Sequence, residues 1–181
     1  MKNTVSVMMR ALVIGAALLA GQAYAEIVLT PNEADYAWHD EGNCNAACVH
    51  DLTGDTVVEL YKQNVGGSEE FGAADWYTTT FDPLNDPVSA TIVWDGPGYI
   101  DCPICWLLVK DGNEDPNKYL FDLSEWDGME TIQLNDFWPG NGAISHVSIF
   151  GDVTNVPTPA TLALLGLGAL GLAFSRRRKQ A

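Results

Sequence analysis

Residues 118–134 read KYLFDLSEWDGMETIQL, and this stretch decides the class of fold. It holds two runs rich in β-branched, aromatic and aliphatic residues, 118–123 and 130–134, and such runs favour strands. In the second run apolar and polar side chains alternate, which is typical of a strand with one buried face. Asp127 and Gly128 lie between the two runs, and this pair favours a tight turn. We therefore expect a β-hairpin here, with the Ile and Leu of ETIQL facing inward.

The same pattern recurs through the middle of the chain, where Gly, Pro, Asn and Asp separate short apolar runs. The other predicted strands cover residues 27–30, 56–62, 76–81, 89–94, 105–110 and 144–150. Short strands at this spacing predict an all-β fold, an antiparallel, jelly-roll-like β-sandwich. Residues 32–54 are the least periodic part, so we expect a loop there, held by Cys44 and Cys48. No window of twelve residues in the middle shows the 3.6-residue period of a helix.

The middle of the chain is strongly acidic. Residues 26–155 hold all 24 Asp and Glu residues, and Lys62, Lys110 and Lys118 are the basic residues among them, so the net charge is 3 − 24 = −21. Such a domain repels nucleic acid and anionic lipid, so we expect no nucleic-acid partner. The charge suits either a highly hydrated surface or divalent cations. All six Trp residues lie here as well and supply area for a core.

The first 25 residues have the pattern of a secretory signal peptide. Lys2 and Arg10 precede and flank an apolar stretch at 11–20, and AYA, ending at Ala25, is a small-x-small cleavage site. We expect cleavage after Ala25, with an uncleaved N-terminal anchor as the alternative. The domain prediction is therefore a signal peptide at 1–25, an acidic β-sandwich at 26–155 and a tail at 156–181.

Four cysteines, Cys44, Cys48, Cys102 and Cys105, fit two disulfides in an exported chain. We favour local pairing, because the CPIC stretch carries a Pro suited to a β-turn and the other pair is four residues apart. The alternative joins the two pairs across the sequence. A zinc site with His50 is a lesser possibility. Redox chemistry at CPIC is disfavoured, because WLLVK follows it and reads as a strand rather than a helix.

One stretch raises the question of calcium. DGNED places Asp111, Asn113 and Asp115 at alternate positions, as the start of a calcium loop does. Pro116 stands where an EF-hand needs Gly, and no Glu occupies the twelfth position. A looser cage with Asp101 or Asp122 stays open, beside the simpler interpretation of a polar hairpin loop. We expect no cofactor, with calcium as the alternative.

Hydrolytic catalysis has little support in the sequence. The three histidines, His39, His50 and His146, belong to none of the familiar catalytic motifs. Ser145 and His146 are neighbours in a predicted strand, so we expect their side chains on opposite faces. We predict no enzyme activity. Aromatic faces that stack on sugars are an alternative role, and the candidates are Trp38, Trp76, Tyr77, Phe137 and Trp138.

The chain ends VPTPATLALLGLGALGLAFSRRRKQA. Pro157, Thr158 and Pro159 precede an apolar run at 160–174. The basic residues after it are Arg176, Arg177, Arg178 and Lys179. As a helix this run is ~22 Å long, short for a ~30 Å hydrocarbon core, although a strained span is feasible. The positive end stays cytoplasmic.

These tail residues resemble the PEP-CTERM sorting signal of Gram-negative bacteria, with Thr158 in place of the usual Glu. The resemblance implies recognition by an exosortase, a membrane enzyme that acts on the tail and is expected to cleave near the Pro-Thr-Pro motif. The product is then released or transferred to the cell envelope or extracellular matrix. Such proteins usually accompany exopolysaccharide production. Residues 107–151 also resemble a small domain often carried by such proteins, for which the resemblance implies no activity.

The sequence therefore predicts a non-catalytic protein of the cell envelope or extracellular matrix, tethered to the inner membrane by its tail until an exosortase acts. Exopolysaccharide is the expected partner. A carbohydrate-binding module, with or without calcium, is the alternative, and a small hydrolase is a more remote one.

Overall fold

The computed structural model describes residues 25–140 and 142–152. Its strands are β1 (Glu26–Leu29), β2 (Tyr36–Trp38), β3 (Val57–Asn64), β4 (Glu69–Glu70), β5 (Tyr77–Asp82), β6 (Ser89–Trp94), β7 (Cys105–Lys110), β8 (Lys118–Asp122), β9 (Thr131–Leu134) and β10 (His146–Asp152). The helices are α2 (Ala46–Thr53) and the 3-10 helices η1 (Pro31–Glu33) and η2 (Ala74–Trp76). Every predicted strand is present, with ends within two residues of those expected.

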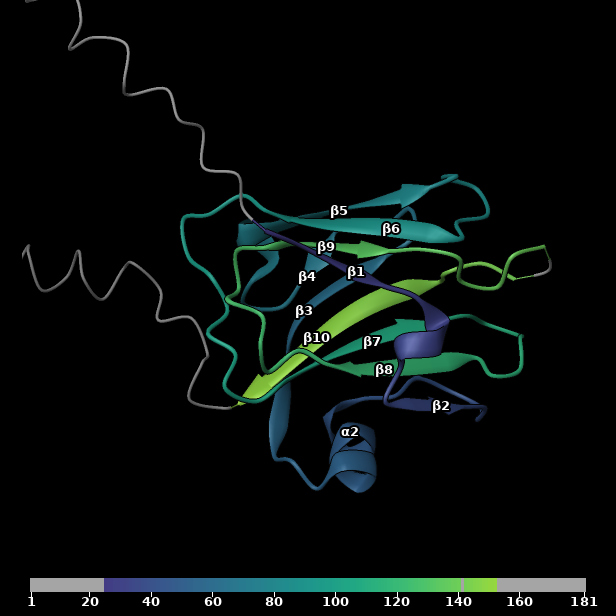
Figure 1. The fold of residues 1–181 in the computed structure, drawn as a ribbon, viewed down its shortest axis with the longest axis horizontal. Helices are drawn as coiled ribbons and strands as arrows, with labels where there is room; N and C mark the ends of the chain where they lie inside the picture. Colours follow the sequence, from purple (N-terminus) through teal and green to yellow (C-terminus); the bar gives the residue numbers. More distant parts are fainter. Residues whose placement is uncertain (1–24, 141, 153–181) are drawn as a thin grey trace, which may run out of the picture.

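Two sheets face each other, which confirms the predicted all-β sandwich (Figure 1). The four-stranded sheet has the order β1-β9-β6-β5, and the six-stranded sheet has the order β2-β8-β7-β10-β3-β4. Pairing is antiparallel except between β1 and β9, which run parallel from the pair Glu26–Thr131 to the pair Leu29–Leu134. The prediction of a wholly antiparallel sandwich is wrong at this one pair, where the first strand of the described residues is added along an edge.

The hairpin predicted at Asp127 and Gly128 is wrong. β8 pairs with β2 and β7, whereas β9 pairs with β1 and β6, so the chain between them crosses from one sheet to the other. Gly128 has φ of 80°, and a Cβ atom there would lie 2.0 Å from the carbonyl oxygen of Ile100. The hydroxyl of Tyr77 also donates to the Gly128 carbonyl at 2.7 Å. The glycine is thus explained by close backbone approach rather than by a hairpin turn.

Residues 32–54 are not the predicted loop, because they contain β2 and α2. The Asn45 side chain caps α2 by accepting hydrogen bonds from the backbone N–H groups of Ala47 and Cys48. Gly54 ends the helix in the left-handed conformation, with φ of 83°. A helix of eight residues is too short to show its period in a twelve-residue window. The sequence signals that could have predicted it were the two capping residues, Asn45 and Gly54.

The central strands of the six-stranded sheet, β7, β8 and β10, are buried on both faces. Its inner face packs on the four-stranded sheet, as the buried side chains of Leu107, Phe121 and Ile149 do. Its outer face forms a second apolar cluster under α2, which includes Val49, Trp106, Leu108, Leu120 and Phe150. Figure 1 shows α2 on the side of this sheet away from the four-stranded sheet. The four-stranded sheet is simpler, since Ile132 and Leu134 are buried as predicted while alternate residues of β5 are exposed.

Candidate functional site

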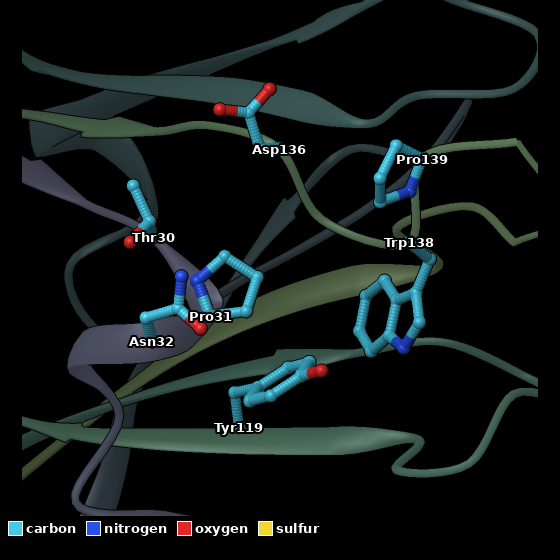
Figure 2. Close-up of a pocket in the computed structure, with 7 residues that line it drawn as sticks. All are labelled: Thr30, Pro31, Asn32, Tyr119, Asp136, Trp138 and Pro139. Carbon is cyan, nitrogen blue, oxygen red and sulfur yellow. The ribbon is translucent and has the colours of Figure 1, made fainter.

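A pocket of about 380 Å³ opens where three segments meet beside the core (Figure 2). The segments are the start of η1, the beginning of β8 and the connection from β9 to β10. The residues that line it are Thr30, Pro31, Asn32, Tyr119, Asp136, Trp138 and Pro139. These positions are distant in sequence, so the sheet topology alone brings them together.

The aromatic side of the pocket is held firmly. The rings of Tyr119 and Trp138 are neighbours, with centroids 5.2 Å apart, and Phe137 packs edge-on to Tyr119 from the core at 5.5 Å. The indole N–H of Trp138 donates to the carbonyl of Pro116 at 2.6 Å. Both ring positions are therefore fixed by neighbours before any ligand arrives.

The connection that carries Asp136 and Trp138 has an unusual backbone. Asp136 has φ of 61° and Trp138 has φ of 46°, and Phe71 is the other non-glycine residue with positive φ in the described part of the chain. Such residues cost on the order of 1 kcal/mol each and tend to occur at functional sites. Phe137 between them is fully buried, and its backbone N–H donates to Val88 at 2.9 Å. The strained turn thus anchors Phe137 in the core and places its two neighbours around the pocket.

Polar atoms complete the lining. The backbone N–H and hydroxyl of Thr30 donate to the carboxylate of Glu33, at 2.8 and 3.1 Å. The side chains of Asn32 and Asp136 and the hydroxyl of Tyr119 make no hydrogen bond to another residue within 25–140 or 142–152. Burial raises the pKa of Tyr119, so its hydroxyl is protonated at neutral pH. The pocket therefore offers one donor-acceptor hydroxyl, one amide and one carboxyl group to a ligand.

The cysteines pair locally, which confirms the favoured prediction. Cys44 bonds to Cys48 and Cys102 to Cys105, with Cα atoms 5.2 and 5.1 Å apart. The zinc alternative is wrong, because the thiolates it needs are joined in disulfides. Cys105 is the first residue of β7, so the CPIC stretch opens a strand, as expected, and not a helix.

Asp111 of the calcium prediction has a structural role. Its two carboxylate oxygens accept hydrogen bonds from the backbone N–H groups of Asn113, at 2.6 Å, and Ala143, at 2.5 Å. These bonds tie the β7–β8 loop to the segment before β10. Asp111 and Asn113 line a second pocket of about 360 Å³, together with Asp86. In the described residues no group of three or more His, Cys, Asp or Glu side chains is placed to hold a metal ion.

The three histidines do not share one role. The Nδ1 atoms of His39 and His50 donate to the backbone carbonyls of Glu114 and Asp55. His146 is buried, and desolvation together with repulsion from the nearby lysines lowers its pKa to about 3. The expected separation of Ser145 and His146 is wrong, since Ser145 Oγ lies 3.4 Å from His146 Nδ1. β10 begins only at His146, so strand alternation does not apply to Ser145.

Most of the aromatic candidates belong to the core or to the sheet. Tyr77 and Phe137 are buried in the inner core, and Trp76 packs against it. Trp38 lies on β2 under the ammonium group of Lys118, 5.9 Å from the ring centre. Trp138 alone among them lines the pocket of Figure 2. Sequence reasoning missed Asn32, Tyr119 and Asp136, because no local pattern links these three positions.

One comparison with known proteins gives a match. A family described as the PEP-CTERM protein-sorting motif matches residues 155–179. The chain therefore carries a PEP-CTERM sorting motif near its C-terminal end. The motif implies processing by an exosortase and passage across the membrane. No curated protein and no solved structure matches the chain.

The matched segment contains the predicted sorting residues. These are Pro157, Thr158, Pro159, Arg176, Arg177 and Arg178. They lie outside the residues that the structure describes, as does nearly all of the predicted signal peptide. Within 25–140 and 142–152, no helix has the length and apolar character needed to cross a membrane.

Proposed function

We propose that this PEP-CTERM protein is a non-catalytic component of the cell envelope or extracellular matrix that associates with exopolysaccharide. The observation that carries the proposal is the sorting motif at residues 155–179, joined to a folded acidic domain. The precursor is tethered to the inner membrane by its tail, with the basic end in the cytoplasm, until an exosortase acts.

The charge distribution supports a role in a hydrated matrix. Of the three lysines between the predicted signal peptide and the tail, Lys118 is fully buried and forms a salt bridge with Asp40, and Lys110 is almost fully buried. Nearly all the exposed charge of the domain is therefore negative. A surface of this kind stays solvated at high local concentration and resists nonspecific association.

The histidines support a non-catalytic role. His146 is neutral at physiological pH because its pKa is about 3, and no carboxylate among the described residues is hydrogen-bonded to it. A general base needs a pKa closer to the working pH. His39 and His50 use Nδ1 to hold backbone carbonyls, which suits a structural function.

The test is to follow the protein by cell fractionation in its producing host. We expect wild-type protein in the envelope or medium, shortened at its C-terminus. The Pro157→Ala, Pro159→Ala double variant should stay full-length in the inner membrane, because both prolines of the sorting motif are lost. Thr154→Ala, just before the matched segment, is the control and should be processed normally. Release of the double variant at the wild-type rate, or normal release from cells without exosortase, would contradict the proposal.

A further inference from the structure

We propose that the pocket between Tyr119, Trp138, Asn32 and Asp136 binds one ring of a neutral saccharide. This inference deepens the proposed function and rests on it for the polymer that supplies the sugar. The pocket's size, rings, polar atoms and charge support both the site and the ligand class.

The size of the pocket fits a single sugar residue. Small-molecule pockets span about 300–1,000 Å³, and this one, at about 380 Å³, lies near the lower limit. Figure 2 shows the Tyr119 and Trp138 rings on one side, with Pro31 and Asn32 from the η1 segment beside them. A ring that enters between these segments meets apolar and polar groups at once.

The two aromatic rings supply the apolar contact. Each of the two residues is 9 % exposed, and this exposed part gives the C–H groups of a sugar ring an apolar surface to pack against. Tyr119 and Trp138 cost little entropy on binding, because Phe137 and the Pro116 carbonyl already fix their rings. The left-handed backbone at Asp136 and Trp138 is explained if this placement is needed for binding.

The polar atoms match hydroxyl groups. Asn32 can donate and accept, the Tyr119 hydroxyl can do both, and the Asp136 carboxylate can accept from two neighbouring hydroxyls. None of these three side-chain groups is hydrogen-bonded to another described residue, so a ligand would not have to displace a protein partner. A hydroxyl-rich ring uses all three, whereas an apolar ligand would leave the carboxylate unpaired.

The charge of the site selects neutral sugars over acidic ones. Asp136 is the one charged residue in the lining, and no lysine or arginine of the described part of the chain lines the pocket. The three lysines of the domain lie on β3, β7 and β8, where Lys110 and Lys118 pair side by side across the six-stranded sheet. A uronic acid would therefore meet repulsion without a counter-ion.

The experiment uses exported protein purified from the producing host, titrated by calorimetry with neutral hexasaccharides of β-glucan, α-glucan and β-mannan, and with hexagalacturonate. We expect at least one neutral probe to bind below ~10 mM, equally in calcium and in chelator. Tyr119→Phe and Asn32→Ala should each weaken that binding about tenfold, the effect of losing one hydrogen bond to the ligand. Asp136→Asn keeps a residue that tolerates positive φ, and it should weaken neutral binding while strengthening binding of the acidic probe.

Matched controls lie outside the pocket. Tyr99→Phe alters an exposed tyrosine and Asn43→Ala an exposed asparagine, and both should bind as the wild type does. Urea denaturation of each variant checks that the fold is intact. Failure of every neutral probe to bind, unchanged binding in both Tyr119→Phe and Asn32→Ala, or preference of the wild type for hexagalacturonate would overturn the inference. None of these outcomes alters processing of the tail, so the sorting proposal is tested separately.

Discussion

At its central strands both faces of the six-stranded sheet are buried, but by different partners. The inner face is covered by another sheet and is apolar over most of its length, as Leu107, Val109 and Ile149 illustrate. The outer face is covered by one short helix and the chain before it. That face is apolar only in part, and a row of polar residues, Lys118, Lys110 and His146, crosses it side by side.

The difference shows how much cover a small helix provides. α2 has eight residues, about 12 Å of length, so it shields only part of a six-stranded face. Where it does not reach, the loop around Asp40 folds over the lysines and supplies the partner of Lys118. The outer face therefore depends on a disulfide, a salt bridge and a neutral histidine, and each of these can be removed separately.

The largest expected effect compares neighbouring leucines on β7. Leu107 faces the inner core and Leu108 the cluster under α2, and both are fully buried. Each Leu→Ala change should lower the free energy of unfolding by about 3 kcal/mol, since both leave a cavity. Thr80→Ala, on the exposed face of β5, is the control and should change it by less than ~0.5 kcal/mol in urea denaturation. A cost below ~1 kcal/mol for Leu108→Ala would mean that the outer cluster is not a true core.

Next in size are the disulfides, one for each face. Replacing Cys44 and Cys48 with Ala should cost about 2 kcal/mol of unfolding free energy, and so should replacing Cys102 and Cys105, because the closed loops are similarly short. Only the first change should also reduce the far-UV helical signal and speed amide exchange in α2, which it anchors. Equal loss of helix in both variants would show that α2 does not depend on its own disulfide.

The pH dependence of stability should report on His146. Its pKa is about 3 in the folded protein, below its ordinary 6.5, so the unfolded chain takes up a proton first as the pH falls. The stabilisation is complete above pH 6.5 and is lost between 6.5 and about 3, at up to ~1.4 kcal/mol per pH unit. His146→Gln should flatten this slope in unfolding curves measured at several pH values, and His50→Gln, at an exposed position, should not. If the slope is unchanged in His146→Gln, the pH dependence of stability does not come from His146.

The smallest effect concerns Asp40. The hydrogen bond from Lys118 holds the pKa of Asp40 below its ordinary 3.8, and burial opposes this. Stability from this pair is therefore present above pH 3.8 and is lost as the pH falls through the lower folded pKa. Asp40→Asn should cost up to ~1 kcal/mol at neutral pH, because Asp40 is half exposed and two other oxygens also accept from Lys118. The difference in unfolding free energy between the wild type and Asp40→Asn should disappear in acid. A difference that stays constant with pH would contradict this account.

Features set by neighbouring residues could be predicted from the sequence, whereas features set by distant residues could not. The strands at 89–94 and 105–110 were predicted to the residue, because β-branched and aromatic runs between turn formers are local signals. The turn residues Asp127 and Gly128 are also a local signal, but which strands pair with β9 depends on residues far away in the sequence. The spacing of the cysteines favoured the local disulfides. The helix α2 was missed, because Val49 is buried against strands that come later in the sequence.

The sequence by itself determined eight of the ten described strands, the acidity of the domain and the sorting tail, because each is written in consecutive residues. The tertiary structure alone decided that β7, β8 and β10 are buried on both faces, and this explains why their apolar runs do not alternate. It also decided the pocket, since Asn32, Tyr119 and Asp136 meet only when the two sheets close. Burial and binding depend on distances between chain segments, and these are set by packing rather than by neighbouring residues.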